Sequence, residues 1–292
     1  ALGAALATSF IFSAGMCKSV GGFIMRDWHI SETWMPFIAA VLFLGPLLLS
    51  LWLLDQVPPP SVRDEELRTK RQPMSVAERK DFIKKFFLGL VFIILLYSML
   101  TAFRDFRDNF SAEIWKSLGY GNSPEIFTTT EVPVSIVCLL MIGSIVMIRN
   151  NRTALLVIHS LILTGTLLLG LATYAFQLAW ISPPVWMTLM GLGLYLGYIP
   201  FNSSFFDRLL ATFQVTGTVG LVIYVADSVG YLGSVGVLFY KQFGQRNLSW
   251  LDFFIDGAYI LSVIGTFLVI ASMLYFRKKN QALALNAPQS NC

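Results

Sequence analysis

Charged residues are scarce in this chain, since Asp, Glu, Lys and Arg together make up 13% of its 292 residues. A soluble globular domain usually carries about 25%, so this shortage argues against a soluble protein. Cysteine is also rare, and the three cysteines form no CxxC pair and no zinc-ligand spacing. The sequence has no HExxH, GxSxG or Walker-type phosphate loop. We therefore expect no resident metal or cofactor and no enzyme activity.

Apolar residues are abundant instead, at 55% of the chain, and they come in long blocks. A helix that crosses the hydrocarbon core, roughly 30 Å thick, needs about 20 mainly apolar residues. The sequence therefore predicts an all-α fold, a polytopic transmembrane helix bundle. Eight segments meet the requirement, at about Leu2–Met25, Trp34–Leu54, Phe86–Phe103, Thr130–Ile148, Thr153–Gln177, Val185–Phe206, Thr212–Tyr240 and Phe253–Phe276.

Two joins between these spans are very short. Four polar residues, 149–152, separate the fourth and fifth spans, and a polar run of this kind cannot lie in lipid. Ser182, Pro183 and Pro184 separate the fifth and sixth spans, because paired prolines interrupt the hydrogen bonds of a helix.

The basic residues are distributed unevenly between the two sides of the predicted bundle. Lys18 lies inside a span, and the odd-numbered joins hold Arg26, Arg104, Arg107, Lys116, Lys241 and Arg246. The other 14 of the 21 Lys and Arg residues lie in the even-numbered joins and the C-terminal tail. Because cytoplasmic loops carry the excess of basic residues, we predict a multi-pass protein of the cell (inner) membrane with both ends in the cytoplasm. This bias explains the net charge of +4, so the expected partner is the lipid bilayer, not nucleic acid.

The polar segment 55–85 joins the second and third spans. Ser75 and Glu78 form a capping-box pattern, which predicts a short surface helix leading into the third span. The chain opens at Ala1, already inside an apolar segment, so we expect that an N-terminal portion precedes it.

This layout of two spans, a basic linker, six spans and a basic tail resembles the last eight of the twelve helices of a major facilitator superfamily protein, in an outlying bacterial-type branch. Gly143, Arg149 and Arg152 match the glycine and basic turn that the family has within each bundle, although its acidic residue is missing. Residues 15–22 are rich in glycine, like the signature on the fifth helix, but lack its proline. The resemblance implies four parts: the last two helices of an N-terminal bundle (1–54), a cytoplasmic basic linker (55–85), a six-helix C-terminal bundle (86–279) and a disordered cytoplasmic tail (280–292).

Two ionisable residues lie clearly inside predicted spans, away from their ends. Each costs about 2.5–3.5 kcal/mol at the centre of a membrane helix, so it normally faces protein or water. Asp227, with Tyr224 and Ser228 as neighbours, is either a proton-coupling or cation-binding carboxylate or an anchor of interhelical hydrogen bonds. Lys18, among small residues, either contacts an anionic solute or extends its amine to the outer face.

A stripe of polar residues marks the end of the third span. Its members recur at helical spacing and are Tyr97, Thr101, Arg104, Asp105 and Asp108. In the superfamily the first helix of each bundle lines the central cavity, so the resemblance implies a path from the outer mouth, with Arg104 as an anion clamp. The alternative is a solvated helix end whose charges pair with each other.

The sixth span carries a second polar face, formed by Tyr195, Tyr198 and Asn202 near Pro200. Proline permits a kink there, and the face either lines the cavity or serves structural hydrogen bonds. Other polar groups have simpler interpretations: His159 as hydrogen-bonded packing, and Glu131, Asp252 and Asp256 as interfacial residues.

These observations favour a secondary active transporter that moves a small polar solute by alternating access, coupled to protons. Lys18 and Arg104 are compatible with an anionic solute. The alternative is a non-transporting membrane sensor or scaffold of the same fold that acts through the linker 55–85. The sequence gives no sign of an oligomer, so a monomer is the default expectation.

Overall fold

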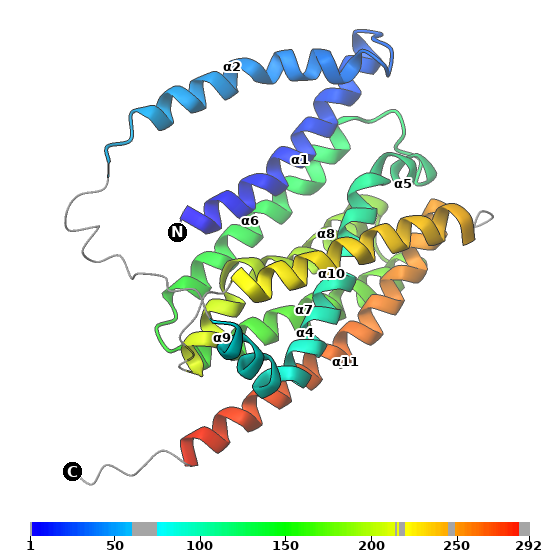
Figure 1. Cartoon of the computed structure of the whole chain (residues 1–292). Helices are drawn as coiled ribbons and strands as arrows, with labels where there is room; N and C mark the ends of the chain where they lie inside the picture. Colours follow the sequence, from blue (N-terminus) through cyan, green and yellow to red (C-terminus); the bar gives the residue numbers. More distant parts are fainter. Residues whose placement is uncertain (1, 60–74, 214, 216–219, 245–248, 286–292) are drawn as a thin grey trace.

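The computed structural model describes residues 2–59, 75–213, 215, 220–244 and 249–285, and every regular element in these residues is a helix (Figure 1). The all-α fold class is therefore confirmed. The elements are α1 (Leu2–Asp27), α2 (Met35–Asp55), α4 (Val76–Asn109), α5 (Ser111–Ser117), α6 (Glu125–Met147), α7 (Asn151–Gln177), α8 (Pro183–Pro200), the π-helix η1 (Phe201–Phe205), α9 (Phe206–Thr212), α10 (Gly220–Phe239), the π-helix η2 (Tyr240–Gly244) and α11 (Trp250–Leu285).

Seven helices in the described part of the chain are long and apolar enough to cross a membrane. They are α2, α4, α6, α7, α8 with its continuation to Thr212, α10 with η2, and α11. They indicate a multi-pass membrane protein. The first predicted span forms a helix, α1, and the side chains of its residues 2–8 lie outside the described residues. The eighth span therefore stays a prediction.

Helix α4 contains both the expected surface helix and the third span as one element of 34 residues. The capping box is confirmed, because Ser75 Oγ accepts from the Glu78 amide at 3.3 Å and Glu78 Oε2 accepts from the Ser75 amide at 2.7 Å. The helix continues to Asn109, beyond the predicted end at Phe103. The charged residues 104–108 therefore belong to the helix itself.

The short joins form where the polar and proline residues predict them. Asn150 caps α7 by accepting hydrogen bonds from the amides of Arg152 and Thr153. Pro183 is the first residue of α8, a position where proline loses no helical hydrogen bond. At the other end of α8, Pro200 is followed directly by η1, so the break in regular α-helix occurs at the expected proline.

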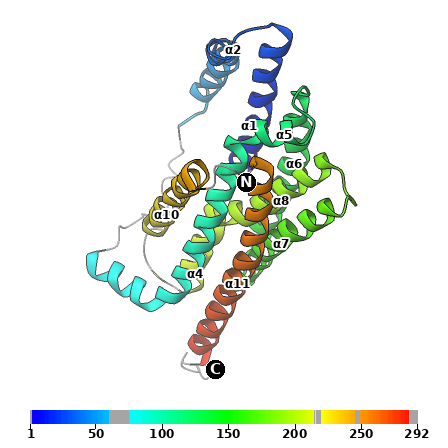
Figure 2. The same cartoon turned by 90° about the vertical axis from the view of Figure 1, so that its right-hand side faces the viewer.

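Helices α4 and α6–α11 pack into one bundle, and α1 lies along α6 (Figures 1 and 2). Within the bundle α4 contacts α8, α10 and α11, α6 contacts α8, and α7 contacts α8 and α11. Helix α2 contacts α1, and none of its residues is buried. The charged stripe of α4 consequently lies between α1, α8 and α10.

The C-terminal end differs from expectation. Helix α11 extends to Leu285, so residues 280–285 are helical although disorder was predicted from 280 onward. After its apolar part, α11 continues through polar residues without a break, because no proline or glycine ends the helix before Leu285. Residues 286–292 lie outside the described residues. So do residues 60–74, on which the sensor or scaffold interpretation depends.

Candidate functional site

A carboxylate and a tyrosine from two different helices meet within the bundle. The Tyr97 hydroxyl on α4 donates to Asp227 Oδ1 on α10 at 2.5 Å. The same hydroxyl oxygen lies 3.2 Å from Asn202 Oδ1 on η1. Tyr97 is buried, Asp227 is partly exposed and Asn202 is exposed. The site is therefore anchored in the bundle at the tyrosine and open at the carboxylate and the amide.

Tyr198 connects this group to the charged residues in the last turns of α4. Its ring stacks on that of Tyr97 with centroids 5.3 Å apart, and the guanidinium carbon of Arg104 lies 4.0 Å from its centroid. Such cation–π contacts stabilise a cation that is largely removed from water. We call Tyr97, Tyr198, Asn202 and Asp227 the tyrosine–aspartate cluster, and Arg104 is its nearest cation.

The positive charge of Arg104 is balanced by the carboxylate of Asp105, its neighbour in sequence. Its Nη2 lies 2.6 Å from Asp105 Oδ1, and the other carboxylate oxygen of Asp105 accepts from Ser234 Oγ on α10 at 2.7 Å. The charges thus pair with each other, as the alternative interpretation of the stripe expected. The same interpretation expected this end of the helix to be solvated. That part is contradicted, because the Arg104 side chain is only 10% exposed.

Four further charges from three helices form a second group, which we call the ion-pair network. Lys18 Nζ on α1 lies 3.3 Å from Asp108 Oδ1 on α4. Arg107 Nη1 lies 3.8 Å from the same oxygen, while Arg107 Nη2 lies 2.5 Å from Glu131 Oε1 on α6. The pair of Arg107 and Glu131 is buried, whereas that of Lys18 and Asp108 is partly exposed. The network therefore extends from the surface into the packed interior.

Tyr195 on α8 lies beside this network. Its hydroxyl is buried without a hydrogen-bond partner in the described part of the chain, and so are Arg107 Nε and Glu131 Oε2. The side chain is close enough to the charges of Arg104 and Arg107 for electrostatic interaction. One turn earlier, Gly191 allows the Arg107 guanidinium to approach the helix, since a Cβ there would lie 2.8 Å from Nη2.

The remaining predicted site residues have different positions. Thr101 is buried against Gly230 of α10, and its hydroxyl has no hydrogen-bond partner among the described residues. Tyr224 is 74% exposed on the outside of α10 and does not join the tyrosine–aspartate cluster.

Glu131 has a partner that the sequence analysis did not identify. Asp252 and Asp256 are exposed, as interfacial residues should be, but Glu131 is buried and paired with Arg107. Sequence analysis missed this pair because Arg107 was placed outside the third span and Glu131 at the outer end of the fourth. The available signal was the spacing, since Arg107 follows Arg104 by three residues and so continues the same helical face.

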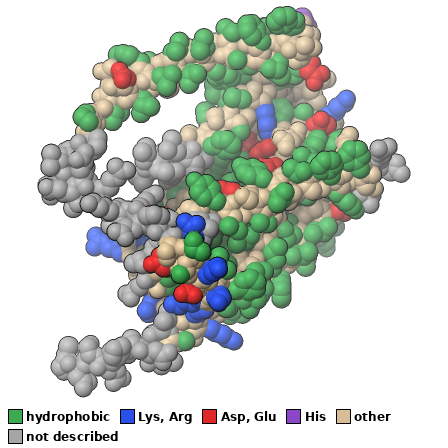
Figure 3. Space-filling view, in the orientation of Figure 1, with side chains coloured by type: hydrophobic (Ala, Val, Ile, Leu, Met, Phe, Trp, Pro, Cys, Tyr) green, Lys and Arg blue, Asp and Glu red, His purple; other side chains and the backbone are tan. Residues whose placement is uncertain are grey.

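The possible metal ligands of the chain are dispersed in the described structure. The described residues contain no group of three or more His, Cys, Asp or Glu that could hold a metal ion. His159 is buried, with its ring nitrogens 2.8 Å from Leu155 O and 3.2 Å from Ser272 Oγ, which confirms its interpretation as hydrogen-bonded packing. Figure 3 shows acidic and basic side chains together on the face between α1 and α10, within largely hydrophobic surroundings.

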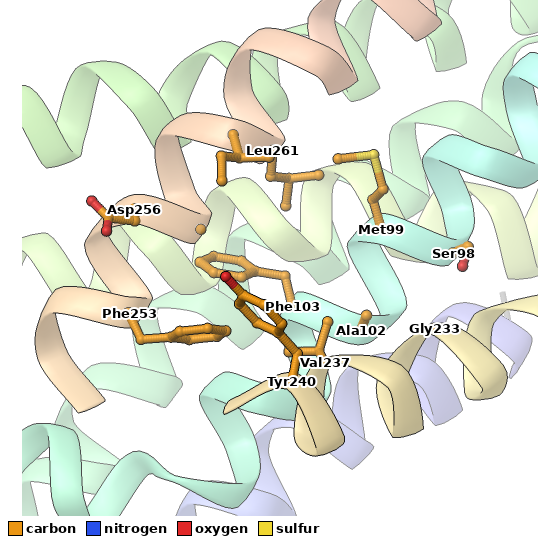
Figure 4. Close-up of a pocket in the computed structure, with 12 residues that line it drawn as sticks. Ser98, Met99, Ala102, Phe103, Gly233, Val237, Tyr240, Phe253, Asp256 and Leu261 are labelled. Carbon is orange, nitrogen blue, oxygen red and sulfur yellow. The ribbon is translucent and has the colours of Figure 1, made fainter. Parts of the chain in front are cut away.

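A separate apolar cavity of about 470 Å³ lies between α4, α10 and α11. The rings of Phe103, Tyr240 and Phe253 face it together with Leu261, while the Asp256 carboxylate points away from the rings (Figure 4). None of the predicted site residues lines this cavity. It is therefore distinct from the tyrosine–aspartate cluster and from the ion-pair network.

The chain was compared with known proteins and protein families. No curated protein and no solved structure shows significant similarity to the chain. One family model, described as a family of unknown function (DUF5690), matches residues 1–279. Since this match covers nearly the whole sequence, the chain belongs to the DUF5690 family.

Proposed function

We propose that this protein is a secondary active transporter in the cell membrane that moves a small polar solute by alternating access, driven by protons. The observation that carries the proposal is the contact between Asp227 and Tyr97, which joins a carboxylate on one spanning helix to a hydroxyl on another. A carboxylate within a span is costly unless it is hydrogen-bonded or reaches water. Asp227 satisfies the first condition, because it accepts from Tyr97, and its partial exposure leaves it accessible from outside the bundle.

The protonation of such a carboxylate can control a conformational change. A helix movement that changes the water access of Asp227 would let the carboxylate take up a proton from one side of the membrane and release it to the other. The break at Pro200 and η1, next to Asn202 in the same cluster, supplies a bent segment at which α8 can move relative to α4.

The arrangement of the helices supports a rocking mechanism like that of the major facilitator superfamily. Helix α1 belongs to the expected N-terminal bundle, yet it packs along α6 of the expected C-terminal bundle. Lys18 and Asp108 form an ion pair across that same boundary. Charges that pair across the boundary between two bundles are suited to separate when the bundles rock.

Reconstitution tests the proposal. The full-length protein is placed in proteoliposomes, a pH gradient is imposed, and uptake is measured for a broad panel of small polar metabolites. We expect Asp227→Asn to abolish accumulation driven by the gradient while solute exchange at equal pH continues. Asp207→Asn, at an exposed position on α9, is the matched control and should leave both activities unchanged. Absence of flux for every solute would contradict the proposal. Unaltered proton coupling in Asp227→Asn would show that Asp227 has no part in the coupling.

A further inference from the structure

A second cavity, of about 640 Å³, lies between α1, α5 and the start of α6. Its size is in the range of small-molecule sites, which span about 300–1,000 Å³. Side chains of Met25, Trp115, Tyr120 and Phe127 supply an apolar and aromatic lining. We call it the α1–α6 cavity, and Lys18 of the ion-pair network is one of its lining residues.

Lys18 and Arg26 are the charged residues that line the α1–α6 cavity, and both are cations. Arg26 is already held by Asp27 at 2.7 Å and lies 3.7 Å from Glu125. Among the described residues Lys18 makes one hydrogen bond, to Asp108 at 3.3 Å, although an ammonium group can donate three. Lys18 is therefore the cation that can accept a further anionic partner.

Asp108 can break its ion pair with Lys18 and still have a positive charge nearby. Arg107 Nη1 lies 3.8 Å from the same Asp108 oxygen, so a small rotation of the carboxylate shortens that second contact. The Lys18 and Asp108 side chains are 29% and 25% exposed, and partly hydrated pairs of this kind are weak. An incoming anion thus competes with a replaceable partner.

We infer that the α1–α6 cavity binds a small organic anion, with its carboxylate on Lys18 and its non-polar body against the aromatic lining. This inference rests on the proposed transport function, for which it names the substrate class. The geometry also connects the cavity to the buried ion pair. When Asp108 is released from Lys18, its carboxylate turns to Arg107 and competes with Glu131 for that guanidinium. Occupation of the cavity thereby weakens a buried contact between α4 and α6.

Cys17 provides a measurement of binding that needs no transport. It is an exposed free thiol that lines the same cavity, whereas Cys138 is buried. The full-length protein, with Cys292→Ser, is purified in detergent and its reaction with N-ethylmaleimide is followed by mass spectrometry. Benzoate should slow labelling of Cys17 in a saturable manner, and uncharged benzamide should not. Equal labelling with and without benzoate overturns the inference.

Variants of the ion pair separate a ligand site from a structural contact. Lys18→Gln should weaken benzoate protection about ten-fold, since a hydrogen bond to a charged group is lost, and Lys18→Arg should restore it. Asp108→Asn should strengthen protection, because Lys18 no longer has a competing partner. Lys80→Gln, at an exposed position on α4 away from the cavity, is the matched control and should leave protection unchanged. Weaker protection in Asp108→Asn, as a purely structural pair requires, contradicts the inference.

A lipid headgroup carries a similar anionic group, and a second arm of the experiment distinguishes it. The protein is placed in nanodiscs of phosphatidylcholine alone or with phosphatidylglycerol, and the labelling of Cys17 is repeated. Protection by benzoate in both membranes supports a free solute. Protection by phosphatidylglycerol without any effect of benzoate overturns it. A positive labelling result together with no flux in proteoliposomes would reject the proposed transport while leaving the anion site intact.

Discussion

Arg107 and Glu131 form an ion pair with 2.5 Å between Nη2 and Oε1, and both side chains are buried where α4 meets α6 and α8. The guanidinium also donates to Met187 O at 3.2 Å. An ion pair in this position has given up most of its hydration, so each partner depends on the other. Its energetic role can be tested directly.

Removing one partner should destabilise the protein strongly. We expect Glu131→Ala to reduce the free energy of unfolding by about 3–5 kcal/mol, because Arg107 is left buried without its counter-charge. Unfolding in detergent, followed by circular dichroism during denaturant titration, measures this change. Glu125→Ala, at an exposed position on the same helix, is the control. A double replacement of Arg107 and Glu131 by methionine should recover much of the loss, and failure to recover it would contradict this account.

Tyr97 and Tyr224 provide a matched pair for the tyrosine–aspartate cluster. Tyr97→Phe removes the hydroxyl that donates to Asp227, so we expect uptake driven by a pH gradient to fall at least ten-fold, the loss expected for a hydrogen bond to a charged group. Tyr224→Phe removes a hydroxyl on the outside of α10 and should have no effect. Initial uptake rates in proteoliposomes decide the question, and equal rates for the two variants would argue against a role for the cluster.

Close approach of α7 and α8 depends on glycine. A Cβ on Gly165 would lie 2.5 Å from the carbonyl oxygen of Gly193, so the helices must move apart to accept a side chain. We expect Gly165→Ala to lower the free energy of unfolding by about 1–3 kcal/mol. Gly143→Ala on α6 is the control, since nothing lies within 4 Å of its Cβ position, and it should be neutral or slightly stabilising. Similar thermal stability of both variants would contradict the packing argument.

Orientation in the membrane can be read from thiol labelling in intact cells. The distribution of basic residues predicts that the start of α4 faces the cytoplasm and that α5 faces the opposite side. In a background with the native cysteines replaced by serine, Glu113→Cys should therefore react with a membrane-impermeant maleimide. Ser75→Cys should react only after the cells are permeabilised. The reverse pattern would invert the predicted topology.

Much of the local structure could be predicted from the sequence. The apolar blocks determine which segments are helical and long enough to span, because the length of such a block is matched to the bilayer. Ser75, Asn150 and Pro183 mark helix starts through hydrogen bonds or backbone geometry that involve only nearby residues. Pro200 marks the break before η1 for the same reason. Each of these features is local, so the sequence alone is sufficient.

The composition of the candidate site was decided by tertiary structure. Tyr97 and Asp227 are 130 positions apart, and Lys18 and Asp108 are 90 apart, so no local rule brings them into contact. Helical spacing placed Tyr97 and Arg104 on one face of α4, yet only the packing of α8 and α10 shows which partners that face meets. The sequence determined which polar residues lie in an apolar environment, and the rotation of each helix in the bundle decided which of them are partners.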